Sequence, residues 1–167
     1  MGINIKLEKA QLADAEMIVR INTAAYNSDK NQFGGGGDGG PPGYDSLEHI
    51  KGSITRFPSY KICLGEETIG WFLLADVDEN MVELHNFCIN PACHNRGYGF
   101  AALQLMETLI PKGKLWILGT PHYSVKNQHV YEKAGFKRAG IFEDGFLIRY
   151  EKPIALQNIE NSIADFI

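Results

Sequence analysis

Residues 90–106 read NPACHNRGYGFAALQLM, a short loop with two glycines that leads directly into an apolar run with helical spacing. The first N–H groups of a helix have no partner within that helix, and glycine lets the backbone approach a ligand closely. A loop in which Gly97 and Gly99 introduce a helix therefore indicates an anion-binding site. The rest of the chain has to indicate which anion is bound.

The composition indicates an ordinary globular domain and argues against two classes of partner. The chain has 167 residues, of which 44% are hydrophobic and 22% are charged, enough for one substantial core. We expect a single domain over residues 1–152 and an amphipathic tail over residues 153–167. The net charge of −4 argues against nucleic acid as the main partner. No apolar run approaches the roughly 18 residues that a membrane span needs.

The N-terminal segment and the cysteines indicate the compartment. The first residues, MGINIKLEKA, lack the apolar core of a secretory signal. The three cysteines of the chain cannot all be paired with one another. We therefore expect a cytoplasmic protein with reduced thiols.

Hydrophobic periodicity predicts an α/β domain with the element order βα(α)βββαβαββ. Three consecutive strand-like segments joined by short turns predict an antiparallel meander, so we expect a mixed, mostly antiparallel central sheet flanked by helices. Asp45 and Glu48 have the spacing of a capping box at the start of the second helix. The expected strands cover residues 3–7, 60–64, 68–75, 81–90, 115–120, 136–142 and 146–152. The first expected helix begins near residue 14, and the second ends near residue 56. The third and fourth expected helices cover residues 99–110 and 125–134.

Residues 28–45 form the segment richest in glycine, with seven glycines and two prolines. Such a composition is too free in its backbone for a core element, so we expect a loop. Two interpretations stay open for it. It is either a mobile surface loop or a lid that faces the substrate, since long loops in compact domains are often functional.

Two familiar phosphate-binding motifs do not fit the glycines of residues 97–99. A phosphate-binding loop of a nucleotide triphosphatase needs a lysine and a hydroxyl residue at the helix start, where this chain has Phe100 and alanines. The dinucleotide fingerprint fits residues 97–102 by spacing. It also needs a strand that ends at the first glycine and an acidic residue after the next strand, and the chain has neither.

A third interpretation accounts for more of the chain. The segment RGYG at residues 96–99 is followed, across one expected strand, by YEKAGF at residues 131–136. This pair of motifs, within the predicted element order, resembles the GCN5-related N-acetyltransferase (GNAT) family over nearly all of residues 3–152. The resemblance implies the GNAT acyl-CoA N-acyltransferase fold.

The resemblance also implies that the bound anion is the pyrophosphate of acetyl-CoA, held by N–H groups from Asn95 to Gly99 and by the helix dipole. Pantetheine would lie between two splayed strands, where N–H groups near Cys88 and Ile89 polarise the thioester carbonyl. His94 stands where the family more often has glutamine or arginine. The residues expected to contact the cofactor are Cys88, Ile89, His94, Asn95, Arg96, Gly97, Tyr98, Gly99, Phe100, Ser124 and Asn127.

Three residues are candidates for acid–base chemistry. Tyr131 matches the tyrosine of the family that protonates the departing thiolate. Glu83 is the first candidate for the base and His85 the second, because in a regular strand they share a face with Phe87 and Ile89. A bulge in this strand would change that face, and a water chain without a single essential base is the alternative.

The same strand carries a group of metal-binding residue types that we do not interpret as a metal site. His85 and Cys88 are three residues apart and would face opposite sides of a regular strand. We therefore expect no metal.

The expected function is transfer of an acetyl group from acetyl-CoA to a primary amine by direct attack in a ternary complex. The alternatives are a non-catalytic acyl-CoA-binding module of the same fold and a nicotinamide-dependent oxidoreductase. A homodimer is possible.

Overall fold

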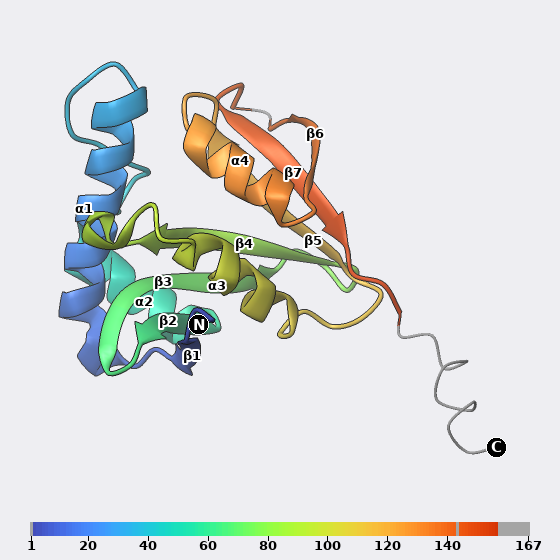
Figure 1. Ribbon diagram of the computed structural model, residues 1–167, viewed down its shortest axis with the longest axis horizontal. Coiled ribbons are helices and arrows are strands. Elements are labelled where there is room, and N and C mark those ends of the chain that lie inside the picture. The colour runs from blue at the N-terminus through green and yellow to red at the C-terminus, as the bar shows by residue number, and fades with distance from the viewer. Residues whose placement is uncertain (1, 143, 157–167) are drawn as a thin grey trace.

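The computed structural model describes residues 2–142 and 144–156 of the chain. Its elements are β1 (Ile5–Lys9), η1 (Leu12–Asp14), α1 (Ala15–Phe33), α2 (Leu47–Arg56), β2 (Ser59–Leu64), β3 (Glu67–Asp76), β4 (Met81–Ile89), η2 (Pro91–Cys93), α3 (Tyr98–Glu107), β5 (Leu115–Pro121), α4 (Val125–Lys133), β6 (Lys137–Ile141) and β7 (Leu147–Pro153), where η denotes a short 3-10 turn. This order confirms the prediction (Figure 1). Within the described ranges, no helix is both long and apolar enough to cross a membrane.

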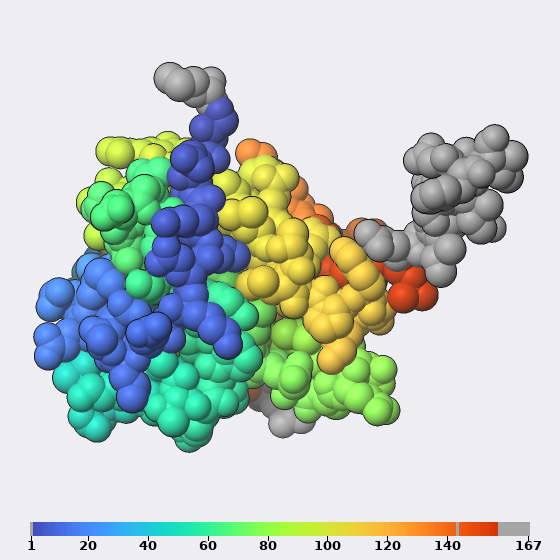
Figure 2. All heavy atoms as spheres, turned by 90° about the horizontal axis from the view of Figure 1, so that it is seen from below, coloured from blue at the N-terminus to red at the C-terminus, as the bar shows by residue number. Residues whose placement is uncertain are grey.

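The seven strands form one sheet in the order β1-β2-β3-β4-β5-β7-β6. Every neighbouring pair is antiparallel except β4 and β5, which are parallel, so the predicted mixed sheet is confirmed. One core lies between the sheet and helices α1 and α2, and a second lies between the other face and helices α3 and α4. Helix α3 lies beside the N-terminal strand β1, as the view from below shows (Figure 2).

The two central parallel strands separate after a short paired section. Residues 81–84 of β4 pair with residues 115–118 of β5, and beyond this point the strands diverge (Figure 1). Backbone N–H and C=O groups that face the gap have no strand partner there. The fold therefore opens in the middle of its sheet, next to the loop that precedes α3.

Strand β4 also contains a bulge close to this opening. Leu73 of β3 pairs with His85, and Trp71 pairs with Cys88, so two residues of β4 stand opposite one of β3. Asn86, one of the two, has a φ of 56°, which lies in the left-handed region. The bulge reverses the alternation of side chains along the second half of β4.

The start and the end of the glycine-rich segment differ from the expectation. Helix α1 continues to Phe33, so residues 28–33 are helical and only residues 34–46 form the connection. The N-cap of α2 is Ser46, whose Oγ accepts a hydrogen bond from the His49 N–H (3.2 Å), and not Asp45. Aspartate and serine are both favourable N-cap residues, so the sequence alone does not determine which of the two caps α2.

The C-terminal end of the fold is described to residue 156. The Ile154 N–H donates to the Lys114 carbonyl (2.9 Å), and the Ile154 side chain is buried. The start of the predicted tail is therefore fixed on the domain. The remainder of that tail, residues 157–167, lies outside the described residues.

A buried asparagine links helix α1, the sheet and the glycine-rich connection. The Asn22 side chain accepts a hydrogen bond from Trp71 Nε1 (2.9 Å) and donates one to the Tyr44 carbonyl (2.8 Å). The Cys88 thiol also donates to Asn22 Oδ1 at 3.6 Å. Because Asn22 is fully buried, its loss would leave these partners without water or protein to bind.

We therefore expect Asn22→Ala to lower the free energy of unfolding by about 2 kcal/mol or more. The matched control is Asn31→Ala on the same helix, where an exposed side chain bonds only Asp38, and there we expect a change within about 0.5 kcal/mol. Urea denaturation measures both. Equal losses for the two variants would contradict the role of the buried hydrogen bonds.

Candidate active site

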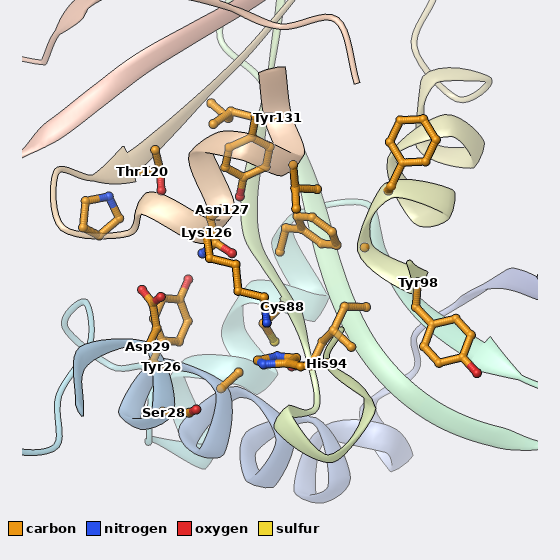
Figure 3. A pocket seen from close by; sticks show the side chains of 18 of the residues that line it. Tyr26, Ser28, Asp29, Cys88, His94, Tyr98, Thr120, Lys126, Asn127 and Tyr131 are labelled. Atoms are coloured by element: carbon orange, nitrogen blue, oxygen red, sulfur yellow. The ribbon is translucent and has the colours of Figure 1, made fainter. Parts of the chain in front are cut away.

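A cavity of about 300 Å³ lies between the diverging ends of β4 and β5. Helix α1 forms one wall and helix α4 the opposite wall, while the start of α3 closes a third side (Figure 3). The residues of β4 that line it are Leu84, which forms the last pair with β5, and four residues beyond that pair, Asn86, Phe87, Cys88 and Ile89. The cavity therefore occupies the gap that the fold leaves in its sheet.

The glycines of the loop before α3 shape one end of the cavity. Gly97 is the N-cap of α3 with a φ of 80°, a conformation that other residues adopt only with strain. Gly99 has no such constraint. A Cβ atom at Gly99 would lie 3.9 Å from Phe87 Cζ and from Val130 Cγ1, so its absence keeps space open between β4, α3 and α4. The unpaired N–H groups and the positive dipole end of α3 adjoin this space and favour an anion.

The lysines that line the cavity come from α4 and not from the glycine loop. Lys126 and Lys133 both line the cavity, and Lys133 Nζ also lies 4.4 Å from the centre of the Phe100 ring. The expected contact Arg96 does not belong to the described lining. Sequence reasoning missed the two lysines, although their spacing of seven residues places them on one helical face.

His94 stabilises the turn between β4 and α3 by a hydrogen bond to the backbone. Its Nε2 lies 2.8 Å from the Ile89 carbonyl, to which it donates. Burial lowers the pKa of His94, so the imidazole is neutral at neutral pH. His94 lines the cavity as expected but contributes no positive charge to an anion there.

The backbone at the end of β4 directs one N–H group into the gap. The Asn90 N–H donates to the Ile69 carbonyl on β3 (2.6 Å), and successive backbone groups of a strand point to opposite sides. The N–H of Ile89 therefore faces the gap, and the N–H of Cys88 faces β3. Of the two expected backbone donors, this geometry retains Ile89 and not Cys88.

Tyr131 enters the cavity from helix α4. Its side chain is 6% exposed, and its ring packs against Phe136 and Tyr150 with centroids 6.1 and 6.0 Å away. Its hydroxyl points into the cavity (Figure 3) and makes no hydrogen bond to the described part of the chain. Burial and, to a smaller extent, the charge of Asp29 raise the pKa of Tyr131, which keeps the phenol protonated at neutral pH.

Ser124 lies behind the cavity wall and not in it. The residue is fully buried, and its Oγ donates to Asp29 Oδ2 (2.6 Å) and accepts from Asn127 Nδ2 (2.9 Å). The Ser124 hydroxyl therefore donates and accepts hydrogen bonds within the protein and is not exposed to the cavity. The expected contact of Ser124 with a cofactor does not agree with this position. Asn127 lines the cavity as expected.

The two candidate bases on β4 do not reach the cavity. Glu83 and His85 contact each other, with Oε2 and Nε2 3.1 Å apart, and neither belongs to the described lining. The predicted face is wrong because of the bulge, which places Phe87 and Ile89 with the α3 core and leaves Glu83 and His85 on the α1 side. Glu83 also lies in the section where β4 and β5 still pair.

The bulge changes one further expectation. His85 and Cys88 lie on the same face of β4, because each pairs with a residue of β3 that faces α1. Within the described ranges, however, no three His, Cys, Asp or Glu side chains gather as metal ligands would.

Asp29 and Tyr26 of α1 line the cavity and were not among the predicted site residues (Figure 3). Asp29 fell within the segment assigned to the glycine-rich loop. The signal that places it was present, since Asp29 continues the spacing of the buried Ile18, Asn22 and Ala25 on one helical face. The remaining predicted contacts that do line the cavity are Cys88, Ile89, Asn95, Gly97, Tyr98, Gly99 and Phe100.

The chain is similar in sequence to proteins of one known family. The model of the acetyltransferase (GNAT) family matches residues 24–136. The chain is 27% identical over 112 residues to the uncharacterized N-acetyltransferase YvbK of Bacillus subtilis. The aligned region covers 64% of this chain and 70% of that protein.

Solved structures share the fold at low sequence identity. The PaiA N-acetyltransferase of Thermoplasma acidophilum in complex with coenzyme A superimposes with a TM-score of 0.71 at 18% identity, over 90% of this chain and 99% of that one. An acetyltransferase of Thermus thermophilus reaches 0.73 at 16% identity, over 92% and 100%. A Bacillus subtilis acetyltransferase in complex with CoA reaches 0.63 at 17% identity, over 92% and 99%.

Proposed function

Because the chain belongs to the acetyltransferase (GNAT) family, we propose that it transfers an acetyl group from acetyl-CoA to a primary amine by direct attack in a ternary complex. One observation carries the proposal: a single cavity joins the start of α3, the gap between β4 and β5, and the hydroxyl of Tyr131. An anion site, a channel and a proton donor are the features that a thioester of a nucleotide cofactor requires.

The cavity supports a definite placement of acetyl-CoA. The pyrophosphate binds at the N–H groups that begin α3, with Lys133 of α4, which lies over the Phe100 ring, as its counter-charge. Pantetheine runs through the gap between the strands. The thioester carbonyl then lies at the Ile89 N–H, which stabilises the oxyanion that forms during attack. Two of the structures that share the fold were crystallised with coenzyme A, which agrees with this cosubstrate.

Acetyl transfer needs a neutral amine, a stabilised tetrahedral intermediate and a protonated leaving group. The amine nitrogen attacks the carbonyl carbon, the C–N bond forms and the C–S bond breaks. Tyr131 gives its hydroxyl proton to the departing sulfur. Cys88 takes no part as a nucleophile, because burial raises the pKa of its thiol to about 12.

The two alternative functions are less well supported. A non-catalytic binding module would have no need of an unpaired tyrosine hydroxyl at the centre of its cavity. A nicotinamide-dependent oxidoreductase of the dinucleotide-binding type needs a parallel sheet, whereas here only β4 and β5 are parallel.

The proposed function is tested by thiol release from acetyl-CoA in the presence of spermidine, kanamycin, L-lysine or trialanine. These probes represent polyamines, aminoglycosides, amino acids and peptide N-termini. We expect at least one of them to release CoA at a rate that depends on protein and amine together. Tight acetyl-CoA binding without release by any of the four would favour the binding module instead.

A further prediction concerns the connection of residues 34–46. It contacts the outer side of α1, where the Gly39 N–H and the Tyr44 hydroxyl both donate to Asn27 Oδ1 (3.0 and 2.8 Å). Since α1 forms the cavity wall, we expect that removing Gly36 and Gly37 raises the KM for the amine several-fold and leaves the Kd for acetyl-CoA unchanged. Calorimetry and steady-state kinetics separate the two quantities.

Two results would change this assignment of the connection. Equal losses in amine kinetics and acetyl-CoA affinity would place it at the cofactor. Unchanged values for both would leave it as a surface loop without a role as a lid.

A further inference from the structure

Asp29 has an unusual position for a carboxylate. It lies near the end of α1, on the wall opposite Tyr131, and both side chains point into the same cavity (Figure 3). Among the described residues that line this cavity, Asp29 carries the only carboxylate. Asp29 and Tyr98, which begins α3, lie on opposite sides of the cavity (Figure 3), so Asp29 lies away from the proposed pyrophosphate site.

A buried serine holds this carboxylate in place. Ser124 Oγ donates to Asp29 Oδ2 at 2.6 Å, a distance typical of a strong hydrogen bond to a charged oxygen. Ser124 is the N-cap of α4, yet its side chain makes no capping hydrogen bond to that helix. Asn127 Nδ2 in turn donates to Ser124 Oγ at 2.9 Å. The hydroxyl that would ordinarily cap α4 is thus committed to Asp29, 95 residues away in the chain.

The second oxygen of the carboxylate is free to bind a ligand. Asp29 Oδ1 has no hydrogen-bond donor within residues 2–142 and 144–156. The charged and titratable groups that face Asp29 are Lys126 and Tyr131 of α4, His94 after η2, Tyr26 of α1 and Tyr123 before α4. In the described residues none of these forms an ion pair or hydrogen bond with it. A partly buried carboxylate that forms no ion pair within the described residues favours a cation that also donates hydrogen bonds.

We propose that Asp29 binds the acceptor as a protonated primary amine and then removes the proton that blocks its attack, with Ser124 as the positioning residue. This inference rests on the proposed acetyl transfer. It assigns to α1 the base that the sequence suggested on β4. It also defines the substrate class as amines that are cationic at neutral pH and that arrive from the α1 side of the gap.

The proton balance of the step is complete. One proton of the ammonium group passes to Asp29 Oδ1, which later releases it to solvent. The neutral nitrogen forms the C–N bond as the C–S bond breaks, and the thiolate takes the proton of Tyr131. The second proton lost by the nitrogen restores the Tyr131 hydroxyl through solvent. One amide, one thiol and one solvent proton result.

The environment of Asp29 suits this exchange. Burial raises the pKa of Asp29, against the opposing effect of the Ser124 hydrogen bond. A raised pKa of Asp29 lies closer to the pKa of an ammonium group, which makes proton transfer from the ammonium group to the carboxylate less unfavourable. Since the ionised form is the active one, activity should fall as the pH drops through this raised pKa, at a higher pH than for an ordinary aspartate.

The test compares four variants with the wild type: Asp29→Asn, Ser124→Ala, Glu83→Gln and, as a control at an exposed carboxylate outside the cavity, Asp76→Asn at the end of β3. Asparagine keeps the shape of Asp29 and the acceptor oxygen for Ser124, so the fold should persist. The assays are thiol release over a range of pH with the best of spermidine, kanamycin, L-lysine and trialanine, and calorimetry with acetyl-CoA.

We expect Asp29→Asn to lower kcat/KM about 100-fold or more at pH 7 with unchanged acetyl-CoA affinity. Its deficit should shrink as the pH rises and free amine becomes abundant, and the acidic limb of the wild-type profile should disappear. Ser124→Ala should show a smaller loss with the acidic limb shifted. Asp76→Asn should match the wild type.

Three results would overturn the inference. A wild-type pH profile in Asp29→Asn would remove its role. A collapse in Glu83→Gln alone would return the base to β4. A wild-type protein that binds acetyl-CoA but releases no thiol with any of the four amines would refute the proposed function and this inference together, which distinguishes it from the first two results.

Discussion

Replacing Tyr131 with phenylalanine is expected to lower kcat by roughly 10² to 10⁴ without changing the affinity for acetyl-CoA. Phenylalanine keeps the ring that packs against Phe136 and Tyr150 and removes only the hydroxyl. That hydroxyl has no partner in the described protein, so its loss leaves no buried group unsatisfied. The effect should therefore appear in the chemical step and not in folding.

The matched control for this variant is Tyr150→Phe. Tyr150 belongs to the same cluster of rings and is fully buried, but its hydroxyl donates to Glu132 (3.0 Å) and does not line the cavity. We expect this control to lose about 1 kcal/mol of stability and to keep its kcat. Full kcat in Tyr131→Phe would show that water protonates the thiolate.

The second large effect is expected at Gly99. Valine at this position would project between Phe87 and Val130 into the space proposed for the cofactor, and we expect the acetyl-CoA affinity to fall about tenfold or more, which corresponds to about 1.4 kcal/mol. Alanine at the same position meets only ordinary contacts at 3.9 Å and should have a smaller effect. Gly97 is a poorer test, because its φ of 80° makes any substitution strained.

Gly52→Val provides the control for the cost of a β-branched residue in a helix. Gly52 lies in α2, away from the cavity, and like Gly99 it has no positive φ. Calorimetry with acetyl-CoA on both folded variants measures the difference. Unchanged affinity in Gly99→Val would exclude the start of α3 as the cofactor site.

The sequence predicted the element order and the helix start at Gly97 and Gly99 because both depend on local patterns. Alternating and helical periodicities determine which segments become strands and helices, and glycines before an apolar run determine an open helix start. These local rules were sufficient to predict that Gly97 and Gly99 stand at an open helix start.

The site residues that were missed depend on contacts between distant parts of the chain. The bulge at Asn86 is set by the pairing of β4 with β3, and no glycine or proline marks it in the sequence. It reversed the expected face of Glu83 and His85. The role of Ser124 depends on Asp29, which lies in a polar segment that was interpreted as loop. Such pairings become visible only when the fold brings the segments together.

The most direct test of the account follows a radiolabelled acetyl group from acetyl-CoA to an amine. In a single turnover with the best of the four amines, we expect the label on the amine nitrogen, unlabelled CoA thiol in equal amount, and no label on protein that was incubated without amine. Label retained covalently on the protein, or no transfer to any amine, would contradict direct acetyl transfer in a ternary complex.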